Sequence, residues 1–294
     1  MQLNALAVNR LRIGEHYWLI LLGGWIVLYA PVYWGLANGL WRYDEHAHEP
    51  LIFLISCWLL WRQRRSIIKA ERKPGWLLGG ALLAIGLLIY LFGRATGVWL
   101  LAVISQISLL AAILLLMSGG AALKAAWFPL VYLVFMIPLP GSLVADLTGQ
   151  LKQLVSAITE SLLYSAGYPI GRTGAVLTVG QYQLLIADAC SGLYSIFSLV
   201  AGGTLFTYLM NRRRLPHIAI MLASMVPIAF CANVIRVGLL VLITYHFGDA
   251  AGQGFLHEFA GAIMFLIGAL LLIGLDAWLA IVFPEGSRQP VSPA

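Results

Sequence analysis

The dominant pattern along this chain is a series of long apolar runs separated by short polar or charged segments. An α-helix needs about 20 apolar residues to cross a bilayer, and on this measure the runs predict about eight spans. The seventh contains Pro227, which removes a backbone donor and predicts a kink. We therefore expect an all-α polytopic membrane protein. The spans are predicted near residues 17–39, 48–61, 76–93, 97–117, 121–140, 192–210, 217–246 and 256–283.

The only long connection runs from Gly141 to Ala189. Its first half, LVADLTGQLKQLVSAITESLLY, has helical periodicity and predicts a short amphipathic helix lying along the outer membrane surface. Its second half, GRTGAVLTVGQYQLLIADA, alternates and predicts a short hairpin. No internal repeat or second domain is evident, so we expect one integral membrane domain over 1–294 with its core at 17–283. Residues 284–294, PEGSRQPVSPA, form a disordered tail on this interpretation.

Composition excludes a soluble domain. The chain is 61% hydrophobic and 10% charged, with a mean hydropathy of +0.89, and no soluble protein of this size needs so apolar a surface. The net charge of +6 would suggest a nucleic-acid partner in a soluble protein. Here the basic residues cluster in short loops, which is typical of the signals that set the orientation of membrane spans. We therefore expect the protein to contact membrane lipid and not nucleic acid. The N-terminus lacks a signal-peptide pattern, so the first span is expected to act as the targeting signal.

Charged residues segregate between alternate loops. With eight spans and both termini in the cytoplasm, the basic clusters all fall on one side of the membrane, while the other side is mainly acidic. This agreement with the positive-inside rule supports the predicted topology. The cytoplasmic bases are Arg10, Arg12, Arg62, Arg64, Arg65, Lys69, Arg72, Lys73, Lys124, Arg212, Arg213, Arg214 and Arg288; the outer acids are Asp44, Glu45, Asp146, Glu160, Asp188, Asp249 and Glu258.

Three chemically reactive side chains converge on the outer face in this topology. Cys190 lies at the outer entrance of the sixth span and His257 at that of the eighth, while Arg236 lies about ten residues, or roughly 15 Å, below the outer end of the seventh. A thiolate is a nucleophile, and a helix N-terminus lowers a thiol's pKa. An imidazole can act as general base and acid, and a buried guanidinium can stabilise an oxyanion or hold a carboxylate. The three residue types together favour cysteine acyl transfer.

Three further residues could support this site. Asn233 lies one helical turn before Arg236 and could orient it. Ser191 begins the sixth helix beside Cys190. Asp188 could orient His257 or pair with Arg236, although an unpaired carboxylate there would raise the thiol's pKa.

Other candidate residues have structural interpretations. Cys57 and Cys231 lie inside spans and are expected to act as small hydrophobic residues. His217, at a span end, is expected to be interfacial. The loop from Asp44 to Glu49 carries two histidines, but their spacing is weak evidence for metal and we favour a solvated loop, so no metal or cofactor is expected. Within that loop, His48 could help to shape an active site.

The segments ADACSGLYSIFSL, CANVIRV and HEFAG resemble the exosortase/archaeosortase family of membrane-embedded cysteine transpeptidases. The family pattern is a Cys-Ser-Gly motif, an Asn-x-x-Arg motif and a later His, here Cys190-Ser191-Gly192, Asn233 to Arg236, and His257. The stretch from His48 to Arg62 is also similar to an early family segment, with Glu49 where Gly is more common. The run HFGDAAGQGFLHEFAG is most similar to the exosortase B group.

The resemblance implies a sorting protease in the bacterial inner membrane, with its active site on the periplasmic face. Such enzymes recognise exported proteins by a C-terminal Pro-Glu-Pro-type motif, a hydrophobic helix and a basic tail. Cysteine attack would form a thioester, and the acyl group would pass to an acceptor nucleophile whose identity the sequence leaves open. Arg236 could also bind the glutamate of the motif.

Two other functions remain open at this stage. A transporter or flippase for surface polysaccharide or lipid intermediates would also use an intramembrane Arg and a broken helix. A non-catalytic scaffold would tolerate substitution of all three reactive residues. Replacing Cys190 distinguishes the classes, since a transporter should tolerate the change and a thiol enzyme should not.

Overall fold

The computed structural model describes residues 20, 22–43, 46–70, 73–185, 192–210, 212, 214–253 and 255–284. They form two compact units, Met1–Pro140 and Gly141–Ala294. The expectation of a single domain stays a prediction.

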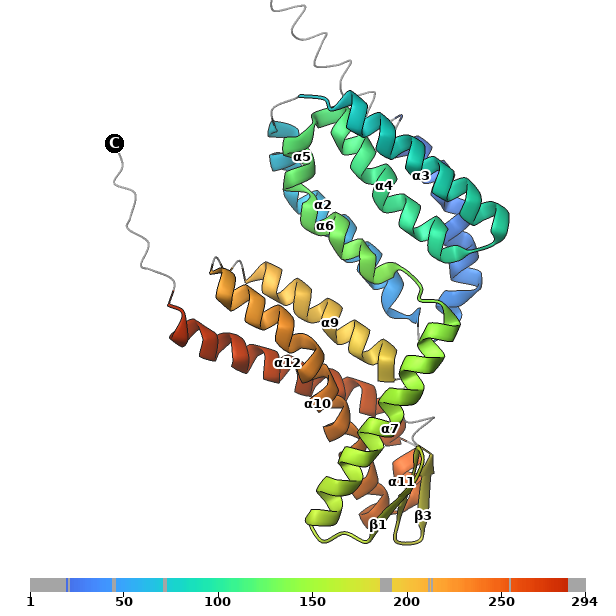
Figure 1. Cartoon of the computed structure of the whole chain (residues 1–294), viewed down its shortest axis with the longest axis vertical. Coiled ribbons are helices and arrows are strands. Elements are labelled where there is room, and N and C mark those ends of the chain that lie inside the picture. The colour runs from blue at the N-terminus through green and yellow to red at the C-terminus, as the bar shows by residue number, and fades with distance from the viewer. Residues whose placement is uncertain are drawn as a thin grey trace, which may run out of the picture. The chain divides into compact units, whose positions relative to one another are not determined.

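The described regular structure of the first unit is helical, apart from one isolated bridge between Lys73 and Gly119 (Figure 1). Residues 22–38 form its first helix. The elements that follow are η1 (Leu40–Arg42), α2 (His48–Lys69), α3 (Trp76–Thr96), α4 (Trp99–Ser118), α5 (Gly120–Ala125), α6 (Trp127–Tyr132) and η3 (Leu133–Met136).

The second unit combines helices with one small sheet. Its elements are α7 (Gly141–Ser165), β1 (Ile170–Thr173), β2 (Val176–Val179), β3 (Tyr182–Leu185), α9 (Gly192–Leu209), α10 (Leu215–Phe247), α11 (Asp249–Gln253) and α12 (Phe255–Val282).

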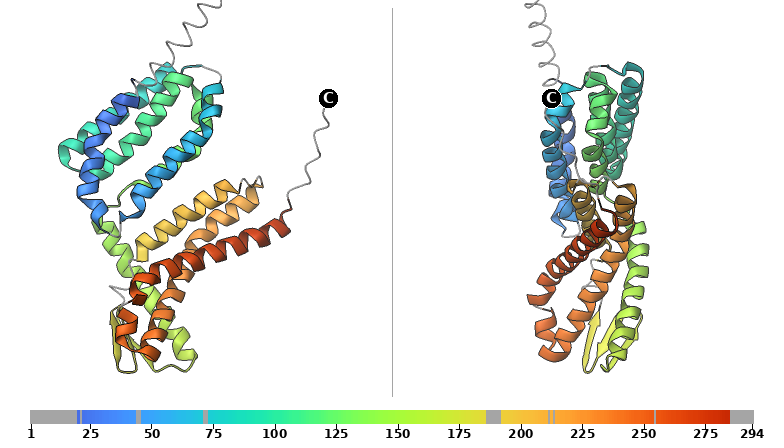
Figure 2. Two further views of the ribbon diagram at one scale, coloured as in Figure 1. Left: turned by 180° about the vertical axis from the view of Figure 1, so that it is seen from behind. Right: turned by 90° about the vertical axis from the view of Figure 1, so that its left-hand side faces the viewer.

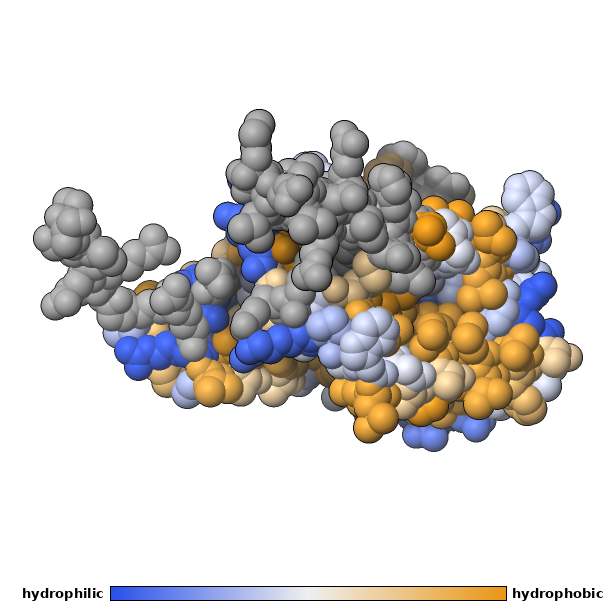
Figure 3. Space-filling model, turned by 90° about the horizontal axis from the view of Figure 1, so that it is seen from above, coloured by the Kyte–Doolittle hydropathy of each residue, from blue (hydrophilic) through white to orange (hydrophobic). Residues whose placement is uncertain are grey.

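The helices identify an all-α membrane protein, as predicted. Four described helices are long and apolar enough to cross a bilayer: α3, α4, α10 and the Gly261–Val282 part of α12. The number rises to five if the broken pair Trp127–Met136 and Gly141–Ser165 counts as one span, and Leu193–Leu209 is a shorter apolar helix. Large apolar side chains such as Leu77 and Ile281 are exposed, and Figure 3 shows hydrophobic residues gathered over part of the face that it presents. Such a surface suits contact with lipid.

The segment predicted as a span at 121–140 is not one helix. It is divided into α5, α6 and η3. Pro129 has no N–H to donate to Ala125, so the helix cannot continue unbroken through this point. The predicted amphipathic helix is present as α7, whereas the predicted hairpin has gained a third strand and is an antiparallel meander in the order β1-β2-β3.

Glycines allow α3 and α4 to pack closely in the first unit, where the two helices lie side by side (Figure 1). Gly79, Gly86 and Gly93 are spaced seven residues apart on α3 and are all buried. A Cβ atom at Gly79 would lie 2.8 Å from Leu116, and one at Gly93 would lie 2.8 Å from the backbone of Ala102. Without a hydrophobic driving force between helices in lipid, such close contact supplies the packing energy.

Helices α9, α10 and α12 form the core of the second unit and lie side by side (Figure 2). A Cβ atom at Gly203 of α9 would lie 3.0 Å from Leu272 and 3.3 Å from Met225. Gly268 of α12 packs directly against Leu199 of α9, with no room for a Cβ atom. These contacts set the register of the three helices.

Helix α10 is longer than a bilayer core requires. Its 33 residues extend about 50 Å at 1.5 Å per residue, against about 30 Å of hydrocarbon. The C-terminal part packs Val234, Val237 and Val241 against α7 and the meander. The predicted kink at Pro227, which lies within α10, stays a prediction.

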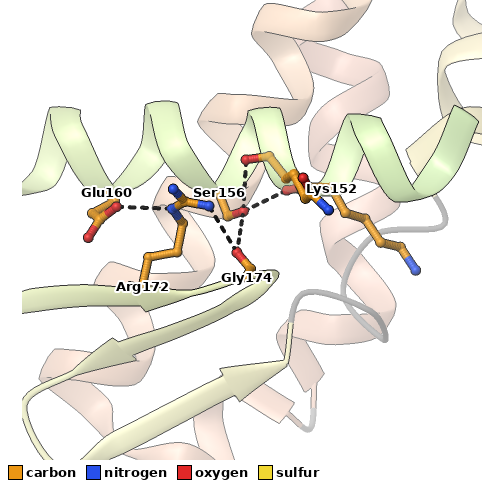
Figure 4. A network of polar contacts seen from close by, with 6 residues as sticks. Lys152, Ser156, Glu160, Arg172 and Gly174 are labelled. Atoms are coloured by element: carbon orange, nitrogen blue, oxygen red, sulfur yellow. Dashed lines mark hydrogen bonds and ion pairs between the residues drawn. The ribbon is translucent and has the colours of Figure 1, made fainter.

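Polar contacts tie α7 to the β1–β2 turn (Figure 4). Arg172 donates from Nε to Glu160 at 3.1 Å and from Nη1 to the Gly174 carbonyl at 3.2 Å. The buried Ser156 hydroxyl donates to the Lys152 carbonyl of its own helix at 2.7 Å and also contacts the Gly174 carbonyl of the turn at 3.4 Å. The turn between β1 and β2 is thereby held on α7.

Candidate active site

The best-defined part of the candidate site is the pair Asn233 and Arg236 on α10. Asn233 is fully buried and Arg236 is 5% exposed. Arg236 follows Ala229 and Ala232 at helical spacing, so it continues the same face of α10. Because Ala229 and Ala232 pack against α9 and α12, this face is the one turned toward those two helices. A guanidinium buried in this way is rarely a passive feature of a membrane helix.

One buried cluster fixes the level at which the three helices meet. Ala232 of α10, Ile196 of α9 and Met264 of α12 belong to it. A second cluster, which includes Met225 and Leu272, lies further from the residue 236 end of α10. From the first cluster to the second, the residue numbers fall along α10, from Ala232 to Met225, and rise along α12, from Met264 to Leu272. Helices α10 and α12 are therefore antiparallel.

The predicted site positions lie at one end of the α9, α10 and α12 core, a short distance along each helix from the first cluster. Arg236 lies four residues beyond Ala232, or about 6 Å. The start of α9 at Gly192 lies four residues before Ile196, again about 6 Å, and His257 lies seven residues before Met264, about 10 Å along α12. The backbones that carry the Asn-x-x-Arg motif and His257 therefore converge with the first residue of α9.

The remaining predicted residues of this site are not described. Cys190, Ser191 and Asp188 lie outside the described residues, between the end of β3 at Leu185 and the start of α9 at Gly192. The side chain of His257 is likewise outside the described set, although its backbone is in the first turn of α12. Their catalytic roles stay predictions.

The His48 segment belongs to the first unit and contains a different polar centre from the one expected. Glu49 is 1% exposed and accepts hydrogen bonds from Trp41 Nε1 at 2.8 Å and from His46 Nδ1 at 2.5 Å. This carboxylate therefore anchors the η1 segment to the first turn of α2. The expectation of a solvated loop was wrong for His46 and Glu49, because both side chains are buried. The role suggested for His48 in shaping an active site stays a prediction.

A second polar centre escaped the sequence analysis. Asp276 of α12 is 7% exposed and contacts His217 of α10 at 2.8 Å between Nε2 and Oδ1, together with Arg212 from the α9–α10 connection. His217 is 1% exposed and lies in the first turn of α10, so it is a buried partner of Asp276, while its expected position at the membrane interface stays a prediction. The signal was present, because Asp276 is an acid inside a predicted span and such residues are functional or paired by default.

Comparison with known families gives one match. A family model described as transmembrane exosortase (Exosortase_EpsH) matches residues 40–274. The matched region contains the Cys-Ser-Gly, Asn-x-x-Arg and His257 positions. It also contains Trp41, His46 and Glu49 of the first polar centre and Arg212 and His217 of the second, whereas Asp276 lies just beyond it. No curated protein and no solved structure matches the chain.

Proposed function

The chain belongs to the transmembrane exosortase family, and from this premise we propose that it is a cysteine transpeptidase that cleaves C-terminal sorting signals of exported proteins. Family membership supports a membrane sorting function of the transpeptidase type. The Cys thioester and the Pro-Glu-Pro-type signal are the finer parts of the proposal.

The proposed reaction uses three residues. The Cys190 thiolate attacks the scissile carbonyl, and His257 gives a proton to the leaving amine as the C–N bond breaks. The product is a thioester between Cys190 and the exported protein. An acceptor nucleophile then attacks the thioester carbonyl and gives its proton to the neutral His257, the C–S bond breaks, and the thiolate and the protonated imidazole are regenerated.

Arg236 would act at the developing negative charge. A guanidinium that is permanently charged and held in a dry site can stabilise the oxyanion of the tetrahedral intermediate. It could instead bind the glutamate of the sorting motif through its planar fork. Asn233 would hold the guanidinium in position.

One observation carries the proposal. Arg236 is buried on the face of α10 that is turned toward α9 and α12, at the end of the core where α9 begins two residues after Cys190 and where α12 contributes His257. A transporter needs a buried cation but has no need of a thiol at this end of α9.

The proposal includes eight spans in the bacterial inner membrane, with both termini cytoplasmic and the site on the periplasmic side. In this topology α9 and α12 enter from the periplasm and α10 leaves toward it. A sorting signal anchored by its own hydrophobic helix would present its motif at the same level. The nucleophile is therefore at the depth where the scissile bond would lie.

The experiment is covalent trapping in membranes that contain the full chain. The probe is an exported reporter protein fused to a C-terminal Pro-Glu-Pro segment, an apolar helix and a basic tail. We expect a mass-shifted adduct on Cys190, no adduct and no processing in Cys190→Ala, and normal processing in Cys231→Ala, whose thiol is exposed elsewhere on α10. Normal processing by Cys190→Ala at wild-type expression would contradict the thiol mechanism and favour transport or scaffolding.

A further inference from the structure

Helix α2 carries an exposed stripe that changes from apolar to basic along one face. The stripe consists of Leu51, Leu54, Trp58, Arg62, Arg65 and Lys69. Their spacing of three, four, four, three and four residues keeps all six on one side of the helix. All six side chains are exposed, so the described part of the first unit leaves this face open.

The apolar half of the stripe suits lipid chains. Leu51 is 57% exposed, Leu54 63% and Trp58 45%. From Leu51 to Arg62 the helix rises about 16 Å, close to half of a bilayer's hydrocarbon thickness of about 30 Å. The apolar part therefore matches one leaflet in length, with a tryptophan near its end where interfacial aromatic residues gather.

The basic half begins where the headgroups would lie. The Arg62 guanidinium lies over the Trp58 ring at 5.5 Å from its centroid. Helical side chains lean toward the N-terminus, which places this cation back at the level of the tryptophan and not further out in water. No ion pair to an acid is found for Arg62, Arg65 or Lys69 among the described residues.

The local charge strengthens the argument. Residues 62–73 contain six bases and one acid, Glu71. Guanidinium groups bind phosphate oxygens through a planar fork, and basic clusters beside a membrane helix attract anionic lipid. A soluble acidic partner would leave the exposed leucines below the cluster without explanation.

We propose that this stripe is a binding site for an anionic phospholipid of the cytoplasmic leaflet. Its acyl chains lie along Leu51 and Leu54, and its phosphate is held by Arg62 and Arg65. The observations come from the first unit and the leaflet comes from the proposed topology, so the proposal does not depend on the reaction proposed for the second unit.

Lipid titration of the purified full-length protein, followed by native mass spectrometry, tests this proposal. The probes are phosphatidylglycerol and phosphatidylcholine with the same acyl chains. We expect wild type to bind phosphatidylglycerol about tenfold more tightly, and Arg62→Gln/Arg65→Gln to lose about tenfold in that affinity. Arg62→Lys/Arg65→Lys keeps the charge and should lose only two- to threefold, because the planar fork is missing.

The matched control is Arg64→Gln/Arg94→Gln. It removes the same charge, but Arg64 lies off the stripe, over Trp61, and Arg94 is in the last turn of α3. We expect wild-type affinity from this variant. The proposal would be overturned if both glutamine double variants lost affinity for phosphatidylglycerol equally, or if wild type showed no preference for phosphatidylglycerol over phosphatidylcholine. It would also be overturned if soluble heparin, a polyanion without acyl chains, bound to this site as well as phosphatidylglycerol does.

Discussion

Arg212 donates two hydrogen bonds to Asp276, from Nε to Oδ1 at 3.1 Å and from Nη2 to Oδ2 at 2.6 Å. With His217 as a second partner, one carboxylate joins α10, α12 and the connection between α9 and α10. The carboxylate lies at the end of these helices opposite to Arg236. Paired guanidinium–carboxylate geometry of this kind is directional as well as strong, so it fixes how the three segments meet.

Asp276→Ala is predicted to destabilise the second unit. The change leaves the Arg212 guanidinium and the buried His217 ring without their acceptor, and removal of one partner from a buried ion pair costs about 3 kcal/mol or more. The measurement is thermal unfolding of the purified full chain in detergent. Asp146→Ala, an exposed acid on α7, is the control and should lie within about 0.5 kcal/mol of wild type. Equal unfolding temperatures for the two variants would show that the Asp276 contacts contribute nothing.

A second prediction concerns the contact between α9 and α12. Gly268→Val is expected to destabilise the protein by about 1–3 kcal/mol, because Leu199 already occupies the space that the new side chain needs. Gly274→Val is a matched control in the same helix, since nothing lies within 4 Å of a Cβ atom there. Unfolding in detergent compares the two. A similar loss from both substitutions would point to helix propensity and not to packing against α9.

The sequence predicted the helices well because the apolar runs report directly on burial in lipid. The runs at 76–93, 97–117, 192–210, 217–246 and 256–283 all became helices with ends within a few residues of the prediction. The run at 121–140 failed because hydropathy takes no account of Pro129, whose missing N–H breaks the helix. Among the described residues, length and composition identify four membrane-spanning helices, or five with the broken pair, against the eight predicted.

The candidate site was predictable only in part. Arg236 was identifiable because a charge in an apolar run is costly without a role, and it is buried as that argument requires. Asp276 satisfies the same criterion, but its partners His217 and Arg212 lie 59 and 64 residues away in sequence. Sequence spacing carries no information about such a contact. Likewise, Glu49 stood out only as a departure from the family pattern, and its bonds to Trp41 and His46 depend on the conformation of the η1 segment.

Arg172→Ala is predicted to loosen the meander without unfolding the protein. The side chains of Arg172 and Glu160 are each 31% exposed, and such pairs contribute about 1 kcal/mol or less. We expect faster amide hydrogen exchange in β1 and β2 and an unchanged global unfolding temperature. Tyr164→Ala, an exposed change on α7 outside the polar contacts, should leave exchange in the meander unaltered. A global loss of stability from Arg172→Ala would mean that the meander and the helical core unfold together.

The last prediction separates the chemical role of Arg236 from its structural one. Arg236→Lys keeps a positive charge in the buried position but lacks the planar fork. Removal of one oxyanion donor typically lowers a rate by about 10²–10³-fold, so we expect processing of the sorting-signal reporter to fall by about that factor while the protein remains folded in membranes. Arg94→Lys, an exposed base on α3, is the control and should process the reporter normally. Normal processing by Arg236→Lys would contradict both the oxyanion role and recognition of the motif's glutamate, because both need the fork. An unfolded Arg236→Lys beside a folded, inactive Cys190→Ala would instead assign the guanidinium a structural role in the packing of α10 against α9 and α12.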